Sequence, residues 1–409
     1  MGNLPVVHIA LPAMGERKYL PKTLACISRQ NLKGFHTWIC VNQPESYHLH
    51  SEKKEICHNN AHTLDFLRDY PLENLHIIDR SSRGNGWEEG KLGVGMARKV
   101  LMDAIAKAAS NEDIIVSMDA DTEFGENYLT SVVTLFSKNP DTLALANPYY
   151  HPLADDHKLN RAMLRYEIYM RYYALNMRFI GTPYHFTPLG SAMASTVKAY
   201  RKIGGLTPKK SGEDFYFLQK MVKAGKVLTY NTETVYPGNR LSDRVFFGTG
   251  PALIKGMSGE WEAYPLFPLQ HFQEVKQTID LFPELLHGPK ETPMDAFLAR
   301  QFKTPDIYEP LRKNHKTPEK FIKACHEKID GLRILQFLKV RYAEEPDRDD
   351  NTLKKFLLTH FECKNIEKEL KNLDFSLSPM EGIDKIRNFL FQNELSIRKD
   401  DTEKNQQKL

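Results

Sequence analysis

The fold is decided by residues 113–121, which read DIIVSMDAD. The first five residues form a short apolar run of the length of one buried strand, and Asp119 and Asp121 follow it closely. Strand-like and helix-like segments alternate around it: strands are predicted over 6–11, 37–41, 75–79 and 143–147, and helices over 95–109 and 126–138. This alternation predicts an α/β fold with a mainly parallel sheet flanked by helices.

The two aspartates are the strongest functional signal. In a mainly parallel sheet, ligands bind beyond the carboxyl ends of the strands, so we expect Asp119 and Asp121 at that edge. Two neighbouring carboxylates repel each other unless a cation neutralises them, and hard oxygen ligands suit Mg²⁺ or Mn²⁺. Such an ion, shared with a diphosphate, would stabilise charge on a departing nucleotide diphosphate. A solvated turn after the strand is the alternative interpretation.

Other acidic motifs fit this segment less well. An EF-hand loop that began at Asp119 would need Gly and Glu where the chain has Phe124 and Thr130. Phosphatases of the haloacid dehalogenase type also use Asp-x-Asp-x-Thr after a strand. Here Thr122 follows at once and Glu123 stands where that motif has Thr, so the fit is partial. A phosphatase with Asp119 as nucleophile stays open as an alternative.

A glycine-rich segment precedes the acidic pair. Residues 84–98 read GNGWEEGKLGVGMAR and match neither a Walker loop nor a dinucleotide-binding fingerprint. The segment nevertheless places Lys91 and Arg98 around a predicted helix N-terminus, which suits an anion. A surface loop that caps a helix explains it equally well.

Two further charged groups are candidates. Glu213 and Asp214 stand at a predicted helix start, where one of them would be a general base for an acceptor hydroxyl. We expect the helix N-terminus to keep such a carboxylate ionised, although acidic residues favour this position in any helix. Arg240 and Arg244 lie in a predicted loop that would close over a diphosphate, or simply be solvated.

Together these segments resemble glycosyltransferase family 2, the inverting enzymes with the GT-A fold, over roughly residues 5–250. The similarity rests on residues 10–16 (ALPAMGE), 93–98 (GVGMAR), 118–121 (MDAD), 200–206 (YRKIGGL) and 213–214 (ED). The resemblance implies donor binding by Pro12 and Glu16. It also implies a metal–diphosphate site at Asp119 and Asp121, and base catalysis by Asp214.

The chain departs from the family pattern at two donor positions. Gly15 stands where the family often has Asn, and Asn42 stands where it often has an Asp that holds the nucleobase. An amide and a carboxylate differ in donor capacity, so the bound nucleotide is left open. Arg240 and Arg244 replace the Gln-x-x-Arg-Trp motif of processive members, and no apolar run approaches the roughly 18 residues of a membrane span. Both features argue against a polymer synthase.

The bulk composition indicates an ordinary globular protein. The chain has 409 residues and a net charge of +4, which gives no reason to expect nucleic acid as a partner. Its five cysteines include no C-x-x-C pair, as in a reducing compartment. Residues 1–11 have no basic region and no long apolar core, so we expect a strand there and not a signal peptide. We therefore expect a cytoplasmic protein that is at most peripheral to the inner face of a membrane.

The expected organisation is a GT-A-type catalytic domain over 1–255, with a nucleotide-sugar half (1–122) and an acceptor half (123–255). A helical extension over 256–398 would pad this domain, form a homo-oligomer or lie against a membrane, and a polar tail (399–409) would be disordered. The expected reaction is metal-dependent, inverting sugar transfer from a nucleotide diphosphate sugar to a glycan, lipid or small-molecule hydroxyl. A dehalogenase-type phosphatase and a non-catalytic GT-A-like binding protein are the alternatives.

Overall fold

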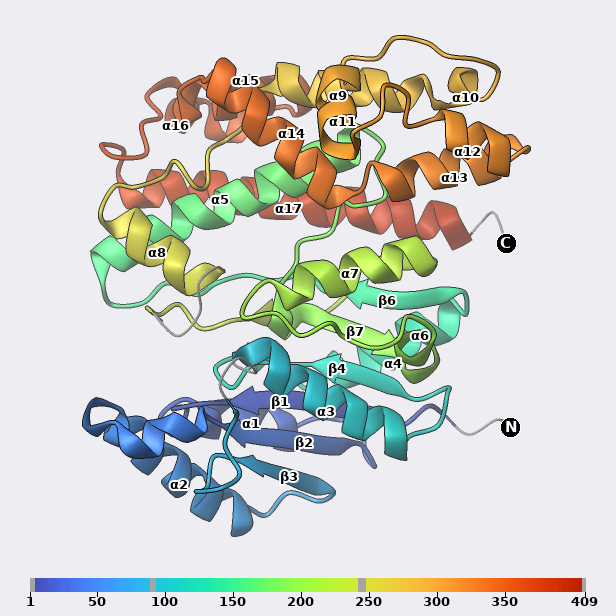
Figure 1. Cartoon of the computed structure of the whole chain (residues 1–409). Coiled ribbons are helices and arrows are strands. Elements are labelled where there is room, and N and C mark those ends of the chain that lie inside the picture. Colours follow the sequence, from blue (N-terminus) through green and yellow to red (C-terminus); the bar gives the residue numbers. More distant parts are fainter. Residues whose placement is uncertain (1–3, 89–92, 242–247, 407–409) are drawn as a thin grey trace. The chain divides into compact units, whose positions relative to one another are not determined.

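The computed structural model describes residues 4–88, 93–241 and 248–406 (Figure 1). The chain forms two compact units, which we call the sheet unit and the helical unit. The sheet unit comprises Met1–Met163, Pro188–Gly259 and Leu395–Leu409, and the helical unit comprises Leu164–Thr187 and Glu260–Glu394. In the described part of the chain, no helix is both long and apolar enough to cross a bilayer.

The sheet unit is built on seven strands in the order β3-β2-β1-β4-β7-β6-β8. Their bounds are β1 Val7–Ala13, β2 His36–Asn42, β3 Leu75–Arg80, β4 Ile114–Ser117, β6 Thr142–Ala146, β7 Met193–Thr196 and β8 Lys226–Leu228. Within this described sheet, β7 runs antiparallel to β4 and β6, and the other pairings are parallel. The predicted fold class, a mainly parallel sheet flanked by helices, is confirmed.

The central strands are apolar because helices cover the sheet. Every residue of β1 and of β4 is buried, as expected for strands that are covered on both faces. The flanking helices are α1 Leu20–Ser28, α2 Lys54–Arg68, α3 Val94–Ala108, α4 Tyr128–Lys138, α6 Val197–Lys202 and α7 Glu213–Ala224 (Figure 1). The helix α3 packs against β1 and β2, so its first turn lies close to the ends of these strands.

Strand register brings the functional loops to one edge of the sheet. The parallel pairs Ala13–Val41 and Ala10–Ser117 place the carboxyl ends of β1, β2 and β4 at the same edge. Because β7 is antiparallel to β4, its first residue, Met193, pairs with Ser117. The segment before β7 therefore also lies at this edge, next to the acidic pair.

A second, two-stranded sheet brings a distant loop to the same edge. The strand β5 (Glu123–Phe124) comes just after Asp121 and pairs antiparallel with β9 (Val235–Tyr236). Gly238, two residues beyond β9, lies so near Asp121 that a Cβ at this glycine would stand 3.1 Å from the Asp121 carboxyl carbon. This pairing positions Arg240 against the acidic pair.

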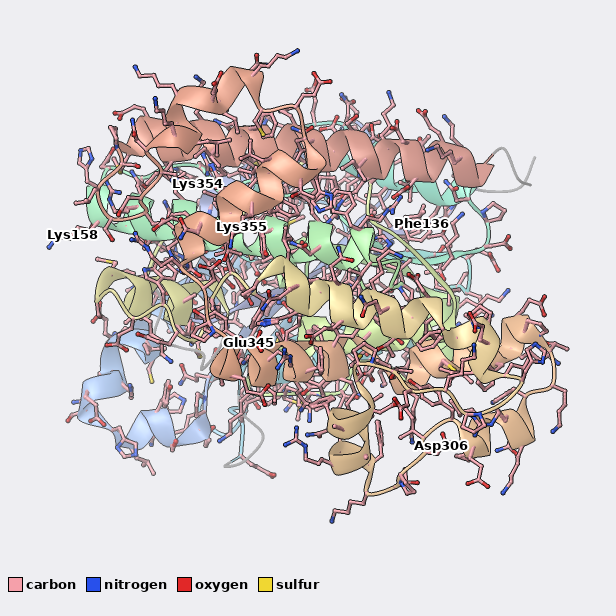
Figure 2. All side chains as sticks on the ribbon, turned by 90° about the horizontal axis from the view of Figure 1, so that it is seen from above. Phe136, Lys158, Asp306, Glu345, Lys354 and Lys355 are labelled. Carbon is pink, nitrogen blue, oxygen red and sulfur yellow. The ribbon has the colours of Figure 1, made fainter. Side chains whose placement is uncertain are left out.

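The helical unit confirms the predicted helical region beyond the sheet. Its helices are α9 Leu269–Asp280, α10 Phe282–Leu285, α11 Asp295–Phe302, α12 Glu309–Asn314, α13 Pro318–Lys328, α14 Gly331–Glu344, α15 Asp349–His360 and α16 Glu367–Lys371. They are amphipathic: α15 buries Leu353, Phe356 and Leu357 and carries the charged Lys354 and Lys355, both labelled in Figure 2. The remaining α-helices of the described chain are α5 (His157–Phe179), α8 (Thr249–Met257) and α17 (Met380–Gln406).

The prediction of a disordered tail is wrong for residues 399–406, which continue the helix α17. One face of this polar helix is buried in spite of its composition. The Arg398 guanidinium donates a hydrogen bond of 3.1 Å to the carbonyl of Thr229, and Thr402 is buried one turn later. Polar side chains that find partners of this kind allow a helix to pack without an apolar stripe. The other predicted domain boundaries stay predictions.

Candidate active site

The two aspartates after β4 are each paired with an arginine. Asp119 Oδ1 accepts a hydrogen bond of 2.9 Å from Arg98 Nη2, and Asp121 Oδ2 accepts one of 2.5 Å from Arg240 Nε. The Asp119 side chain is 38% exposed and that of Asp121 is 17% exposed. Two guanidinium groups thus relieve the repulsion for which the sequence predicted a metal ion.

Arg98 lies in the first turns of α3 and is 2% exposed. Besides Asp119, its guanidinium donates to Glu213 Oε1 at 3.1 Å, to the carbonyl of Gly190 at 3.0 Å and to the hydroxyl of Ser117. Burial alone would disfavour the charge, but the carboxylates of Asp119 and Glu213 outweigh it and raise the pKa of Arg98. Arg98 is therefore a permanent buried cation between two carboxylates.

Asp214 follows Glu213 at the start of α7. Its Oδ1 accepts a hydrogen bond of 2.7 Å from the backbone N–H of Phe215. Burial, and then the charge of Glu213, raise the pKa of Asp214 to about 7, although that hydrogen bond and Arg98 act in the opposite direction. Desolvation and the charge of Glu213 thus oppose the expected tendency of the helix N-terminus to keep this carboxylate ionised.

Arg240 forms the second arginine contact of the site. Its Nη2 donates a hydrogen bond of 2.6 Å to Glu16 Oε1, so one guanidinium joins Glu16 to Asp121. The guanidinium carbon also lies 4.2 Å from the centre of the Tyr19 ring, in cation–π contact. Burial raises the pKa of Asp121, and the charge of Arg240 opposes this shift.

The loop after β1 carries Glu16 and is held by α2. Asn60 Oδ1 accepts a hydrogen bond of 2.8 Å from the N–H of Gly15, and Asn59 Oδ1 accepts one of 3.0 Å from the N–H of Arg17. Gly15 has a φ of 68°, a conformation that favours glycine and turns the chain toward Arg240. Asn59 and Asn60 were not predicted, because two asparagines in a polar helix give no signal of their own.

Asn42 ends β2 and is buried. Its amide nitrogen donates to the carbonyl of Ala13 at 2.9 Å, and its oxygen accepts a hydrogen bond of 3.1 Å from the indole N–H of Trp87. Trp87 was also missed by the sequence analysis. Pro12 is a buried residue within β1, paired with Cys40 of β2. Pro12 and Asn42, which were predicted to bind the sugar donor, thus lie at the expected edge of the sheet. The Asn42 amide is hydrogen-bonded within the protein.

The structure brings most of the predicted site residues together. One set of ion pairs joins Arg240 to Glu16 and Asp121. A second set joins Arg98 to Asp119 and Glu213, with Asp214 beside Glu213. Ser117 and Gly190 complete this set and were not predicted. The predicted residues Lys91 and Arg244 lie outside the described residues.

The donor set fits a divalent ion that is shared with a substrate. Among the residues that the structure describes, no group of three or more His, Cys, Asp or Glu side chains could hold a metal. A divalent ion held by Asp119 and Asp121 would take its remaining ligands from other oxygen atoms. Mg²⁺ behaves in this way when one or two carboxylates and substrate phosphates bind it, and retained water completes its shell.

The fold and site define a class of enzyme, and a family comparison identifies it. Residues 98–201, about a quarter of the chain, match the model of glycosyl transferase family 2. The matched segment begins at Arg98 and contains Asp119, Asp121 and Gly190. The predicted resemblance to this family is thereby confirmed over these residues, and they mark the chain as a glycosyltransferase. No curated protein matches this chain.

Several solved glycosyltransferase structures are similar to the chain at low identity. TarS residues 1–349 from S. aureus, in complex with UDP-GlcNAc, are 11% identical, with a TM-score of 0.41 over 79% of this chain and 91% of that chain. The mannosyltransferase PcManGT from Pyrobaculum calidifontis, with GDP-Man and Mn²⁺, is 13% identical, with a TM-score of 0.37 over 84% and 81%. These TM-scores are below 0.5, so the similarity to these structures assigns no function to the chain.

Proposed function

We propose that this glycosyltransferase moves a sugar from a nucleotide diphosphate donor to a hydroxyl acceptor by a metal-dependent, inverting displacement. The observation that carries the proposal is the division of the site into two acidic groups. Asp119 and Asp121 follow the strand β4, and Glu213 and Asp214 begin a helix on the other side of Arg98. One group suits the donor phosphates and the other suits the acceptor.

On the donor side, Asp119 and Asp121 would hold Mn²⁺ or Mg²⁺, and Glu16 would lie near the nucleotide. The ion would supply charge stabilisation for the departing nucleotide diphosphate. Arg240 would contact the same phosphates, because a guanidinium binds phosphate oxygens in bidentate fashion. A partly exposed arginine can exchange a carboxylate for a phosphate without moving its backbone.

On the acceptor side, Asp214 is the proposed general base. A catalytic base works best when its pKa is near the operating pH, and the pKa of Asp214 is raised to about 7. Asp214 would remove the proton from an acceptor hydroxyl while the donor leaves on the opposite face of the sugar. A dehalogenase-type phosphatase would make no use of Asp214. The acceptor, the homo-oligomer, the cytoplasmic location and the peripheral membrane contact stay predictions.

A thermal-shift screen tests the donor site. UDP, GDP, CDP and dTDP sugars, including UDP-GlcNAc and GDP-mannose, are added with and without Mn²⁺. We expect one nucleotide to raise the melting temperature only when the metal is present. At a ligand concentration of 100 times Kd, the stabilisation should be about 2.7 kcal/mol.

Two variants make the screen specific. Asp121→Asn should remove the metal dependence, whereas Asp65→Asn, which removes a surface acid paired with Arg68, should behave like the wild type. Equal stabilisation with and without metal, or an Asp121→Asn variant that keeps the metal effect, would show that the aspartates do not hold the ion.

A further inference from the structure

Arg98 lies between the two acidic groups to which the proposed function assigns different tasks. Its Nη2 contacts Asp119 on the donor side, and its Nε contacts Glu213 on the acceptor side. With 2% of its side chain exposed, the guanidinium has almost no surface for a substrate. Its role in the site must therefore be exerted through the residues that it holds.

The surroundings of Arg98 leave it little freedom to move. A Cβ at Gly190 would stand 2.2 Å from Arg98 Nη2, so an alanine there would force the guanidinium to shift. The Ser117 hydroxyl donates to the Gly190 carbonyl at 2.6 Å and also accepts from Arg98 Nη1. The planar guanidinium of Arg98 is thus enclosed by the end of β4, the segment before β7 and the first turns of α3.

We propose that Arg98 is a positioning residue that fixes the distance between Asp119 and the start of α7, which carries Asp214. The inference rests on the proposed function, because it concerns the alignment of leaving group and base. Displacements require the reacting atoms in line, and a misplacement of about 1 Å costs roughly 100-fold in rate. A planar guanidinium suits this task because its N–H groups point in fixed directions, whereas a lysine is a point charge.

Arg98 also acts on Asp214 electrostatically. Burial and the charge of Glu213 raise the pKa of Asp214, and the charges of Arg98 and Asp119 act on it in opposite directions. A guanidinium that moves away from Asp214 no longer lowers that pKa. The acid limb of the pH–rate profile should then move to higher pH.

The first test uses Gly190→Ala, which introduces the steric conflict beside Arg98 without removing any charge. Gly288→Ala is the matched control, because a Cβ at Gly288 meets no atom within 4 Å. Amide hydrogen exchange is measured over residues 119–121 and 213–215. We expect both segments to exchange faster in Gly190→Ala and neither to change in Gly288→Ala. If only one segment changes, Arg98 does not couple the two acidic groups.

The second test follows nucleotide release from the donor found in the screen, over a range of pH. In Gly190→Ala and Arg98→Lys we expect kcat to fall by about 10-fold or more, with the donor KM changed much less. In Gly190→Ala the acid limb should move to higher pH. Arg171→Lys is the control for loss of a buried arginine elsewhere, since Arg171 is 1% exposed and pairs with Glu167 and Glu394.

The outcomes separate the two proposals. A lower melting temperature with an unchanged acid limb in Gly190→Ala would show that Arg98 is only structural and would overturn its positioning role. A wild-type protein that releases no nucleotide from any donor would overturn the proposed function instead. In that case the exchange measurement still decides whether Arg98 joins Asp119 to the start of α7.

Discussion

Arg98 and Arg240 hold the two carboxylates of one Asp-x-Asp segment, yet their surroundings differ. Arg98 comes from a helix, is 2% exposed and donates to four groups of the protein. Arg240 comes from the segment after β9, is 20% exposed and donates to Asp121 and Glu16. The same chemical pairing therefore produces a fixed framework in one case and an exchangeable contact in the other.

Burial decides between these two outcomes. Removing one partner of a buried ion pair leaves a charge without compensation, whereas a partly exposed pair can be replaced by water or by another ion. Asp119 is consequently held by the framework, while Asp121 is held by an arginine that can leave. We infer that the donor side of the site is built to rearrange and that the centre of the site is not.

The largest effect on the rate is expected at Asp214, on the acceptor side of the site. Asp214→Asn should lower kcat by about 10²–10⁴-fold, the contribution of a general base, and leave donor binding unchanged. Because the pKa of Asp214 is about 7, the wild-type rate should rise with pH through this value as Asp214 loses its proton. The Asp214→Asn variant should lack this rise of the rate with pH. Rates of transfer and donor titrations measure the two effects, and a fully active variant would rule out Asp214 as the base.

The second prediction compares the arginines directly. Arg98→Leu should lower the free energy of unfolding by about 3–5 kcal/mol, because Asp119 and Glu213 lose their common buried partner. Arg240→Leu should lower the free energy of unfolding by less, because Arg240 is partly exposed and water can replace part of its contact with the two carboxylates. Urea unfolding of both variants measures the difference. Equal costs would show that burial does not distinguish the two arginines.

The sequence predicted the sheet more completely than the site. Short apolar runs such as DIIVS are typical of covered strands, and β4 lies where the run predicts it. The edge of the sheet followed from the strand direction, and Asp119 and Asp121 lie there. These features depend on local composition and on rules that hold for all sheets of this class.

The partners within the site could not be predicted. Arg98 and Glu213 are 115 residues apart, and Arg240 and Glu16 are 224 residues apart. Their pairing depends on the antiparallel placement of β7 and on the small β5–β9 sheet. No local sequence pattern predicts either of these strand pairings. The raised pKa of Asp214 could not be predicted for the same reason, because the burial of a side chain depends on the tertiary structure.

The last prediction concerns metal binding without a donor. Arg240 and a divalent ion are both positive and both need Asp121, so each should weaken the binding of the other. Arg240→Gln should therefore bind Mn²⁺ more tightly in the donor-free protein, by up to about 5-fold if the pair contributes somewhat less than 1 kcal/mol. Titration of the donor-free protein with Mn²⁺, followed by electron paramagnetic resonance, measures this affinity.

The control and the donor-bound measurement make this prediction decisive. Arg68→Gln removes an exposed arginine that pairs with Asp65 and should leave Mn²⁺ affinity unchanged. When the nucleotide diphosphate is present, Arg240 has phosphate oxygens to bind instead of Asp121. The effect of the substitution on Mn²⁺ affinity should then reverse, so that Arg240→Gln binds Mn²⁺ and nucleotide less tightly than the wild type. The same sign with and without nucleotide would mean that Arg240 does not change partners. It would then belong to the fixed framework, together with Arg98.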